Sequence, residues 1–166
     1  MSAIIREHLA LVISAESVRE KGRAGLLGLC LAVMTGLAIQ LVLGMILNLY
    51  ITIPAADART SYLREVETAP GILTAHAVTG LLLLAAAGLL LLRATALRDA
   101  PVIILAAAGF AAIVGAFASG EAFVKNGADG TSLSMAVLTC AALLCYTCLQ
   151  ALIIRQRPSA REGADG

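Results

Sequence analysis

The stretch from Thr68 to Leu92, TAPGILTAHAVTGLLLLAAAGLLLL, decides the fold, because it is long enough to cross a membrane and contains no charged side chain. Runs of about 18 or more apolar residues are typical of transmembrane helices. Three other charge-free runs meet the same criterion, namely Ala24 to Ala56, Ala100 to Gly120 and Gly130 to Ile154. The sequence therefore predicts an all-α integral membrane four-helix bundle made of two hairpins.

The composition of the whole chain agrees with a membrane environment. Its 166 residues are 60% hydrophobic and 14% charged, whereas soluble domains carry about 25% charged residues. The 12 basic and 11 acidic residues nearly balance, so no polybasic surface indicates a nucleic-acid partner. The expected partner is the lipid bilayer. The abundance of Ala and Leu and the preference for Arg over Lys indicate a GC-rich bacterial genome.

The basic residues between the spans predict the orientation in the membrane. Three of them, Arg59, Arg64 and Lys125, lie in the first and third loops, and nine lie elsewhere: Arg6, Arg19, Lys21, Arg23, Arg93, Arg98, Arg155, Arg157 and Arg161. Cytoplasmic segments carry the excess of Arg and Lys. We therefore expect a multi-pass protein of the inner (plasma) membrane, with both termini cytoplasmic and the loop from Ile51 to Pro70 outside.

Polar segments flank the spans at both ends of the chain. Residues 1–23 are the predicted cytoplasmic segment, residues 24–154 the transmembrane domain and residues 155–166 a disordered cytoplasmic tail with Pro, Gly and no apolar period. In the first segment, Ile5, Leu9 and Val12 have a helical spacing that suits the membrane surface or a docking site. We expect the charged, glycine-containing stretch from Ser17 to Gly25 to be a hinge.

Three stretches near the predicted outer ends of the spans are distinctive. They are LNLYITIPA at Leu47 to Ala55, TAHAVTGLLLL at Thr74 to Leu84 and GEAFVKNGADGTSLSMAVL at Gly120 to Leu138. Together they resemble an uncharacterised family of small four-span bacterial integral membrane proteins. The resemblance covers about three of the four spans. It implies the four-span fold and transfers no activity and no site residue.

His76 is the one ionisable side chain deep within a predicted span. Such residues are costly in lipid and are therefore functional candidates. A structural interpretation is a neutral imidazole that faces the bundle and is hydrogen-bonded to Thr74, Asn48 or Glu121. A functional interpretation is a haem protein for electron transfer or haem handling, because HAV at His76 and MAV at Met135 lie at matching depths and His and Met are axial haem ligands.

Glu121 suggests a second functional interpretation, a small-molecule binder or permease with an outward-facing pocket. In that pocket Glu121, His76 and Asn48 would bind the ligand. The structural alternative pairs Glu121 with Lys125, four residues further along the helix. An ion pair of this kind at the membrane surface stabilises a protein little.

The four cysteines, Cys30, Cys140, Cys145 and Cys148, are interpreted as small apolar packing residues. Cys145 and Cys148 form a C-x-x-C, but the predicted orientation places both in the inner half of the fourth span. A thiolate is unfavourable in lipid, and tetrahedral zinc needs four ligands. We predict no metal site, name no cofactor and assign no catalytic residue, because the common hydrolase and nucleotide motifs do not occur.

The first hypothesis for function is a non-enzymatic structural or accessory component of a membrane complex. The spans carry many Gly and Ala residues, and small residues let transmembrane helices pack closely. Assembly with itself or with a larger membrane complex would use these helix faces. The haem protein and the small-molecule binder are the alternatives, and whether the protein is an enzyme stays open.

Cysteines introduced at Ser61 and Ser159 test the orientation. Ser61 lies in the loop predicted outside, and Ser159 in the predicted cytoplasmic tail. In intact cells an impermeant maleimide should label Ser61→Cys and not Ser159→Cys, and both should react after permeabilisation. The parent protein gives the background from the native cysteines. Labelling of only Ser159→Cys in intact cells would reverse the orientation.

Overall fold

The computed structural model describes residues 3–50, 71–126 and 129–156 of the chain. These residues form the helices α1 (Ala3–Tyr50), α3 (Gly71–Ala96), α4 (Ala100–Asn126) and α5 (Asp129–Arg155). Each helix contains a segment long and apolar enough to cross a membrane, namely Glu20–Tyr50, Gly71–Ala96, Ala100–Phe123 and Gly130–Arg155. The four helices pack together, so the predicted all-α four-helix membrane bundle is confirmed.

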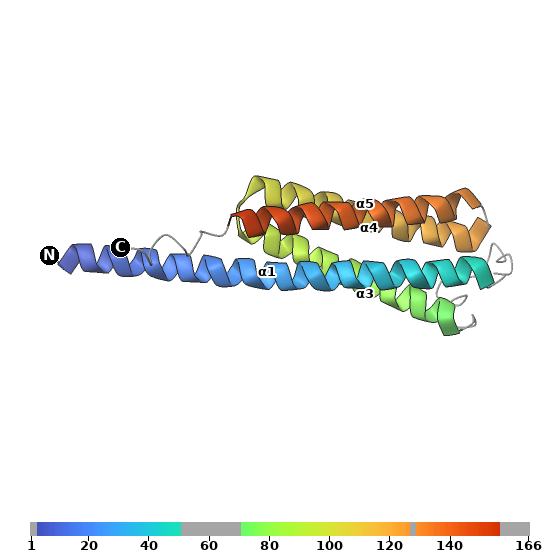
Figure 1. Cartoon of the computed structure of the whole chain (residues 1–166), viewed down its shortest axis with the longest axis horizontal. Coiled ribbons are helices and arrows are strands. Elements are labelled where there is room, and N and C mark those ends of the chain that lie inside the picture. Colours follow the sequence, from blue (N-terminus) through green and yellow to red (C-terminus); the bar gives the residue numbers. More distant parts are fainter. Residues whose placement is uncertain (1–2, 51–70, 127–128, 157–166) are drawn as a thin grey trace, which may run out of the picture.

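The helices follow one another around the bundle, so that α1 contacts α3, α3 contacts α4, α4 contacts α5 and α5 returns to α1. The hairpin of α4 and α5 lies beside the hairpin of α1 and α3 (Figure 1). α3 lies close to α4 near the turn that joins them and diverges from α4 and α5 toward Gly71 (Figure 1). The bundle is therefore closed at the end near the turn between α3 and α4 and more open at the other end.

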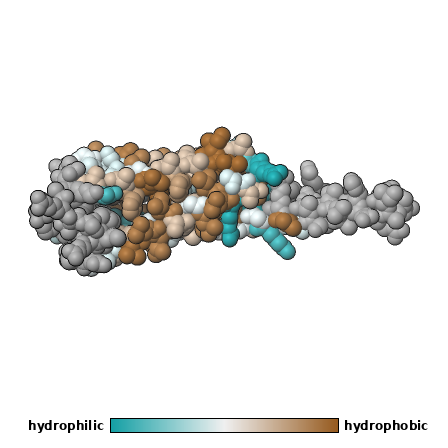
Figure 2. Space-filling model, turned by 180° about the vertical axis from the view of Figure 1, so that it is seen from behind, coloured by the Kyte–Doolittle hydropathy of each residue, from teal (hydrophilic) through white to brown (hydrophobic). Residues whose placement is uncertain are grey.

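The surface of the bundle is apolar around its middle. Figure 2 shows hydrophobic side chains over the helices, with hydrophilic ones gathered where the bundle meets the N-terminal part of α1. Large apolar side chains such as Leu31, Leu82, Ile104 and Leu144 are exposed on all four helices. Exposure of this kind fits a protein whose solvent is hydrocarbon, because such residues need not be buried within the protein.

The core depends on close approach between helices at small residues. Tyr146 of α5 is the largest fully buried side chain, and its ring lies against Gly109 of α4, where a Cβ would be 2.7 Å from the ring atom Cζ. A Cβ at Gly36 of α1 would likewise be 2.7 Å from Cδ2 of Leu83 on α3. Lipid gives no hydrophobic drive for helix association, so close van der Waals packing of this kind holds the helices together.

Hydrogen bonds join three parts of the chain at the closed end of the bundle. Arg23 of α1 donates from Nη1 and Nη2 to the carbonyl oxygen and Oε1 of Gln156, at 3.2 and 3.0 Å. Gln156, just after α5, donates from Nε2 to Oδ2 of Asp99 at 3.0 Å. Asp99 lies in the tight turn between α3 and α4, where Arg98 has a left-handed φ of 53°. The network ties α1, the α3–α4 turn and the end of α5.

The predicted hinge from Ser17 to Gly25 is wrong, because α1 is one continuous helix from Ala3 to Tyr50. Its first part extends beyond the bundle (Figure 1). The stretch contains no proline, and its Arg, Glu, Lys and Ala residues are good helix formers that offset the cost of about 1 kcal/mol for each glycine. The predicted outer loop at residues 51–70 and the tail after residue 156 lie outside the described residues.

Replacing Gly109 with Ala should destabilise the protein, because the added Cβ would overlap the buried Tyr146 ring. Overpacking of a core typically costs about 1–3 kcal/mol. Thermal unfolding in detergent, followed by circular dichroism, measures the loss. Gly28→Ala is the matched control, since a Cβ at Gly28 meets nothing within 4 Å. Equal unfolding temperatures for the two variants would contradict the assigned role of the Tyr146 contact.

Candidate functional site

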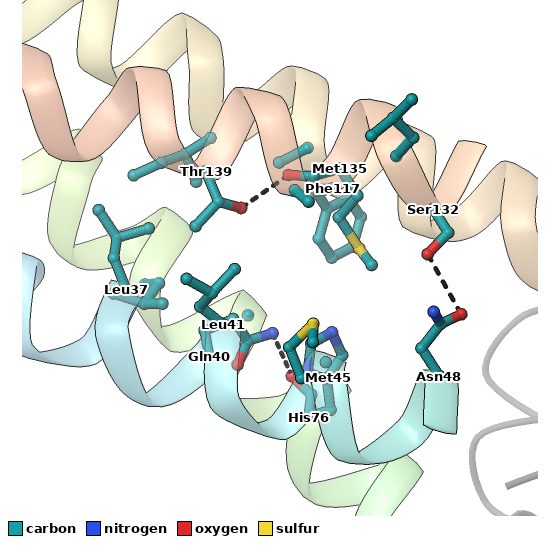
Figure 3. Close-up of a pocket in the computed structure, with 17 residues that line it drawn as sticks. Leu37, Gln40, Leu41, Met45, Asn48, His76, Phe117, Ser132, Met135 and Thr139 are labelled. Atoms are coloured by element: carbon teal, nitrogen blue, oxygen red, sulfur yellow. Dashed lines mark hydrogen bonds between the residues drawn. The ribbon is translucent and has the colours of Figure 1, made fainter. Parts of the chain in front are cut away.

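A cavity of about 390 Å³ lies between all four helices, in the more open half of the bundle (Figure 3). Most of the residues that line it are apolar. Its polar lining residues are Gln40 and Asn48 of α1, His76 of α3, and Ser132 and Thr139 of α5. The cavity therefore combines a mainly apolar wall with a few hydrogen-bonding groups, which is the usual composition of a small-molecule site.

Two features of the fold produce this space. α3 diverges from α4 and α5 in this half of the bundle (Figure 1), and small residues line the cavity on every helix, namely Gly44, Gly80, Ala116 and Ala136. A second cavity of about 70 Å³ shares several lining residues with the first, including His76 and Met135. The Gly and Ala residues of the spans thus leave space in this half of the bundle, whereas elsewhere in the bundle they let the helices pack closely.

His76 faces the interior of the bundle, as the sequence analysis expected, and lines both cavities. A Cβ at Gly44 on α1 would lie 3.3 Å from its ring atom Cε1. The ring atom Nδ1 is buried, and among the described residues it has no hydrogen-bond partner. Nδ1 therefore forms no hydrogen bond to Thr74, Asn48 or Glu121, the partners that the structural interpretation of the imidazole offered.

Gln40 is the residue that joins α1 to α3 beside His76. Its Nε2 donates to the main-chain carbonyl oxygen of His76 at 2.8 Å (Figure 3). The amide reaches this carbonyl because Gly80 has no side chain, and a Cβ there would be 3.2 Å from Nε2. The other amide atom, Oε1, is buried and has no partner among the described residues. Leaving such an atom unpaired costs about 1–3 kcal/mol.

The sequence analysis missed Gln40, because it began from His76 and Glu121 and considered polar partners only near the predicted outer ends of the spans. A signal was present, since Gln40 is an uncharged amide in the middle of a charge-free run. Such side chains commonly form hydrogen bonds between transmembrane helices. What the sequence could not supply is the neighbour, because the bond to His76 depends on how α1 and α3 are aligned.

Met135 and Asn48 also lie where the sequence analysis made them candidates for a shared site. Met135 of α5 lines the same cavity as His76 of α3, and a Cβ at Gly120 would be 3.3 Å from its Sδ. Asn48 lies near the open end of α1, where its Oδ1 accepts a hydrogen bond from Ser132 Oγ of α5 at 3.4 Å (Figure 3). The structure thus brings His76, Met135 and Asn48 to one cavity.

Glu121 lies apart from this group. In the described part of α4 it is half-buried, and it is not among the residues that line the two cavities. The side chain of Lys125, its predicted partner, lies outside the described residues. Within the described lining, His76 is the one ionisable residue, so the arrangement offers hydrogen bonding and apolar contact, not a pair of groups for acid–base catalysis.

The cysteines are separate from the cavity and do not share one environment. Cys30 is buried in the core, and its Sγ donates to the carbonyl oxygen of Tyr146 at 3.5 Å. Cys140 and Cys148 are exposed on α5, and Cys145 is half-buried; all four thiols are free. The described ranges contain no group of three or more His, Cys, Asp or Glu residues that could hold a metal ion. Packing within the bundle explains Cys30, whereas Cys140 and Cys148 lie on its surface.

Comparisons of the chain with protein families, with curated proteins and with solved structures found no match. The resemblance to small four-span bacterial membrane proteins therefore stays a prediction. The structure itself defines the class: this is a multi-pass, all-α membrane protein whose four spanning helices surround a mainly apolar cavity.

Replacing His76 with Leu should not destabilise the fold, because the buried Nδ1 forms no hydrogen bond that would be lost. Leu90→Ala on the same helix is the contrasting variant. Leu90 is fully buried in the core, and truncations of this kind cost about 2–5 kcal/mol. Both are measured by thermal unfolding in detergent. A loss for His76→Leu as large as that for Leu90→Ala would show that the imidazole holds the bundle together.

Proposed function

We propose that the protein binds a small, mainly apolar molecule in the cavity between its four helices. The observation that carries this proposal is the cavity itself, whose volume of about 390 Å³ falls within the range of about 300–1,000 Å³ that is usual for small-molecule sites. Binding was one of the alternatives predicted from the sequence. The supporting residues are now His76, Gln40 and Asn48 in place of a pair between His76 and Glu121.

Three buried side-chain polar atoms have no hydrogen-bond partner among the described residues, and two of them belong to residues that line the cavity; the third, Tyr146 Oη, lies in the packed core. The two at the cavity are Gln40 Oε1 and His76 Nδ1. Most buried polar atoms in proteins have a hydrogen-bond partner, so each exception calls for an explanation. Both atoms expose almost no surface, so a polar group of a bound molecule would pair with them once the side chains turn toward the cavity.

Haem binding is a second candidate, favoured by one observation. His76 and Met135, which the sequence analysis named as axial ligands, line the same cavity from α3 and α5.

Four other statements remain predictions from the sequence: a role as an accessory component of a larger complex, the inner-membrane location, the cytoplasmic termini and the bacterial origin. Binding in the cavity is compatible with each of them.

Filling the cavity tests the proposal. Purified wild-type protein, released gently from detergent into a mass spectrometer, should retain a small molecule that Gly44→Leu does not retain. Gly44 lines the cavity and its Cβ would face the His76 ring, so a leucine there occupies the space. Gly28→Leu is the matched control on the same helix, because a Cβ at Gly28 meets nothing within 4 Å.

Three outcomes decide between the candidates. Retention by wild type and Gly28→Leu, but not by Gly44→Leu, supports binding in the cavity. Retention by all three proteins, or by none, contradicts it. A Soret band in the visible spectrum of the wild type, lost in His76→Leu and altered in Met135→Ala, would identify the bound molecule as haem.

A further inference from the structure

The opening of the cavity lies between α1 and α5. Two of the residues that line it, Met45 of α1 and Leu133 of α5, are 52% and 66% exposed on the outer surface of the bundle. A side chain that belongs both to the wall of a cavity and to the protein surface marks an edge of the opening. Figure 3 shows the cavity between these two helices, with α3 on its far side.

This opening is directed to lipid. Met45 lies within the candidate spanning segment Glu20–Tyr50, and Leu133 within Gly130–Arg155, so we place the exposed surface around both in the bilayer. Toward the end of the bundle, the hydrogen bond between Asn48 and Ser132 bridges α1 and α5. Asn48 is itself exposed and lines the cavity, so this polar bridge marks the edge of the opening nearest the helix ends, whereas Met45 and Leu133 mark its apolar edges, which a molecule dissolved in the bilayer meets.

The polar atoms beside the cavity indicate which hydrogen-bonding group the ligand contains. The Gln40 amide is oriented by the bond from its Nε2 to the His76 carbonyl oxygen, which leaves Oε1 as an acceptor that needs a donor. The imidazole Nδ1 accepts or donates according to its tautomer. A hydroxyl group can donate to one atom and accept from the other, once both side chains turn these nearly inaccessible atoms toward the cavity.

A charged ligand fits poorly. No Asp, Glu, Lys or Arg is among the described residues that line the cavity, and an unpaired charge inside a membrane protein is costly. A plain hydrocarbon fits the walls but leaves Gln40 Oε1 and His76 Nδ1 without partners. We therefore infer that the ligand is a neutral, lipid-soluble molecule with a hydroxyl group, and that it passes between α1 and α5 from the bilayer.

This inference rests on the proposed function and adds the class and the route of the ligand. The chain contains no Trp, so one introduced Trp is a unique fluorescent reporter. Phe117 of α4 lines the cavity, and Phe117→Trp places the reporter there. Phe110→Trp is the matched control, because Phe110 packs against the core seven residues earlier on α4 and does not line either described cavity.

The probes are 11-bromoundecanol and 1-bromoundecane, which share a chain length and a quenching bromine and differ in the hydroxyl group. With the protein in phosphatidylcholine vesicles, the alcohol should quench Phe117→Trp saturably and bind at least about fivefold more tightly than the alkane, as expected for one or two hydrogen bonds. Phe110→Trp should show no saturable quenching by either probe. Iodide in the water should quench neither reporter.

Two further variants, made in the Phe117→Trp protein, separate the hydrogen bond from general packing. Gln40→Leu should reduce the affinity for the alcohol, because it removes the Oε1 acceptor and leaves only His76 Nδ1. Thr139→Val is the control for a polar lining residue, because the Thr139 hydroxyl already donates to the Met135 carbonyl oxygen at 2.8 Å; its affinity for the alcohol should not change. Thermal unfolding of each variant confirms that the bundle is intact.

The results distinguish this inference from the function beneath it. Equal affinity for the two probes, or unchanged alcohol binding in Gln40→Leu, overturns the hydroxyl class. Strong iodide quenching of Phe117→Trp overturns the route from lipid. If either occurs while wild type still retains a molecule that Gly44→Leu loses, binding in the cavity stands. Absence of saturable quenching by both probes overturns the inference, and absence of any retained molecule overturns the proposed function as well.

Discussion

The contact between Tyr146 and Gly109 is the constraint on which the rest of the bundle depends. It brings α5 against α4 at a position where a single methyl group would overlap the ring, and Gly36 and Leu83 make a similar approach between α1 and α3. Lipid provides no hydrophobic driving force for helix association, so the packing at these contacts sets the distances between the helix axes. The bundle is tight where such contacts occur and open where α3 departs from its neighbours.

The open region has a cost that the rest of the fold must offset. Unpaired atoms of Gln40 and His76 each destabilise the protein by about 1–3 kcal/mol, and the space beside them lacks the packing contacts of a filled core. The hydrogen bonds of Arg23, Gln156 and Asp99 at the closed end help to hold the helices in place. The cavity and these hydrogen bonds, which join the helices, thus lie at opposite ends of the bundle.

The sequence predicted the four spans well, because hydrophobic length is a local property that does not depend on neighbours. The inward direction of His76 also followed, since a polar ring avoids lipid. The role of Gln40 could not be predicted, because it depends on which turn of α1 faces Gly80. The hinge failed for a different reason: charge and glycine in Ser17 to Gly25 were taken as a break, whereas helix propensity continued through them.

α1 is one unbroken helix that extends beyond the bundle at one end and lines the cavity at the other. The residues from Ala3 to Arg19 extend the helix by about 25 Å at about 1.5 Å per residue. Arg23 joins α1 by a hydrogen bond to Gln156, just after the end of α5. The C-terminal part of the same helix lines the cavity with Gln40, Gly44 and Asn48. Because no break separates the two parts of α1, a tilt of its N-terminal part would be transmitted to the part that forms one wall of the cavity.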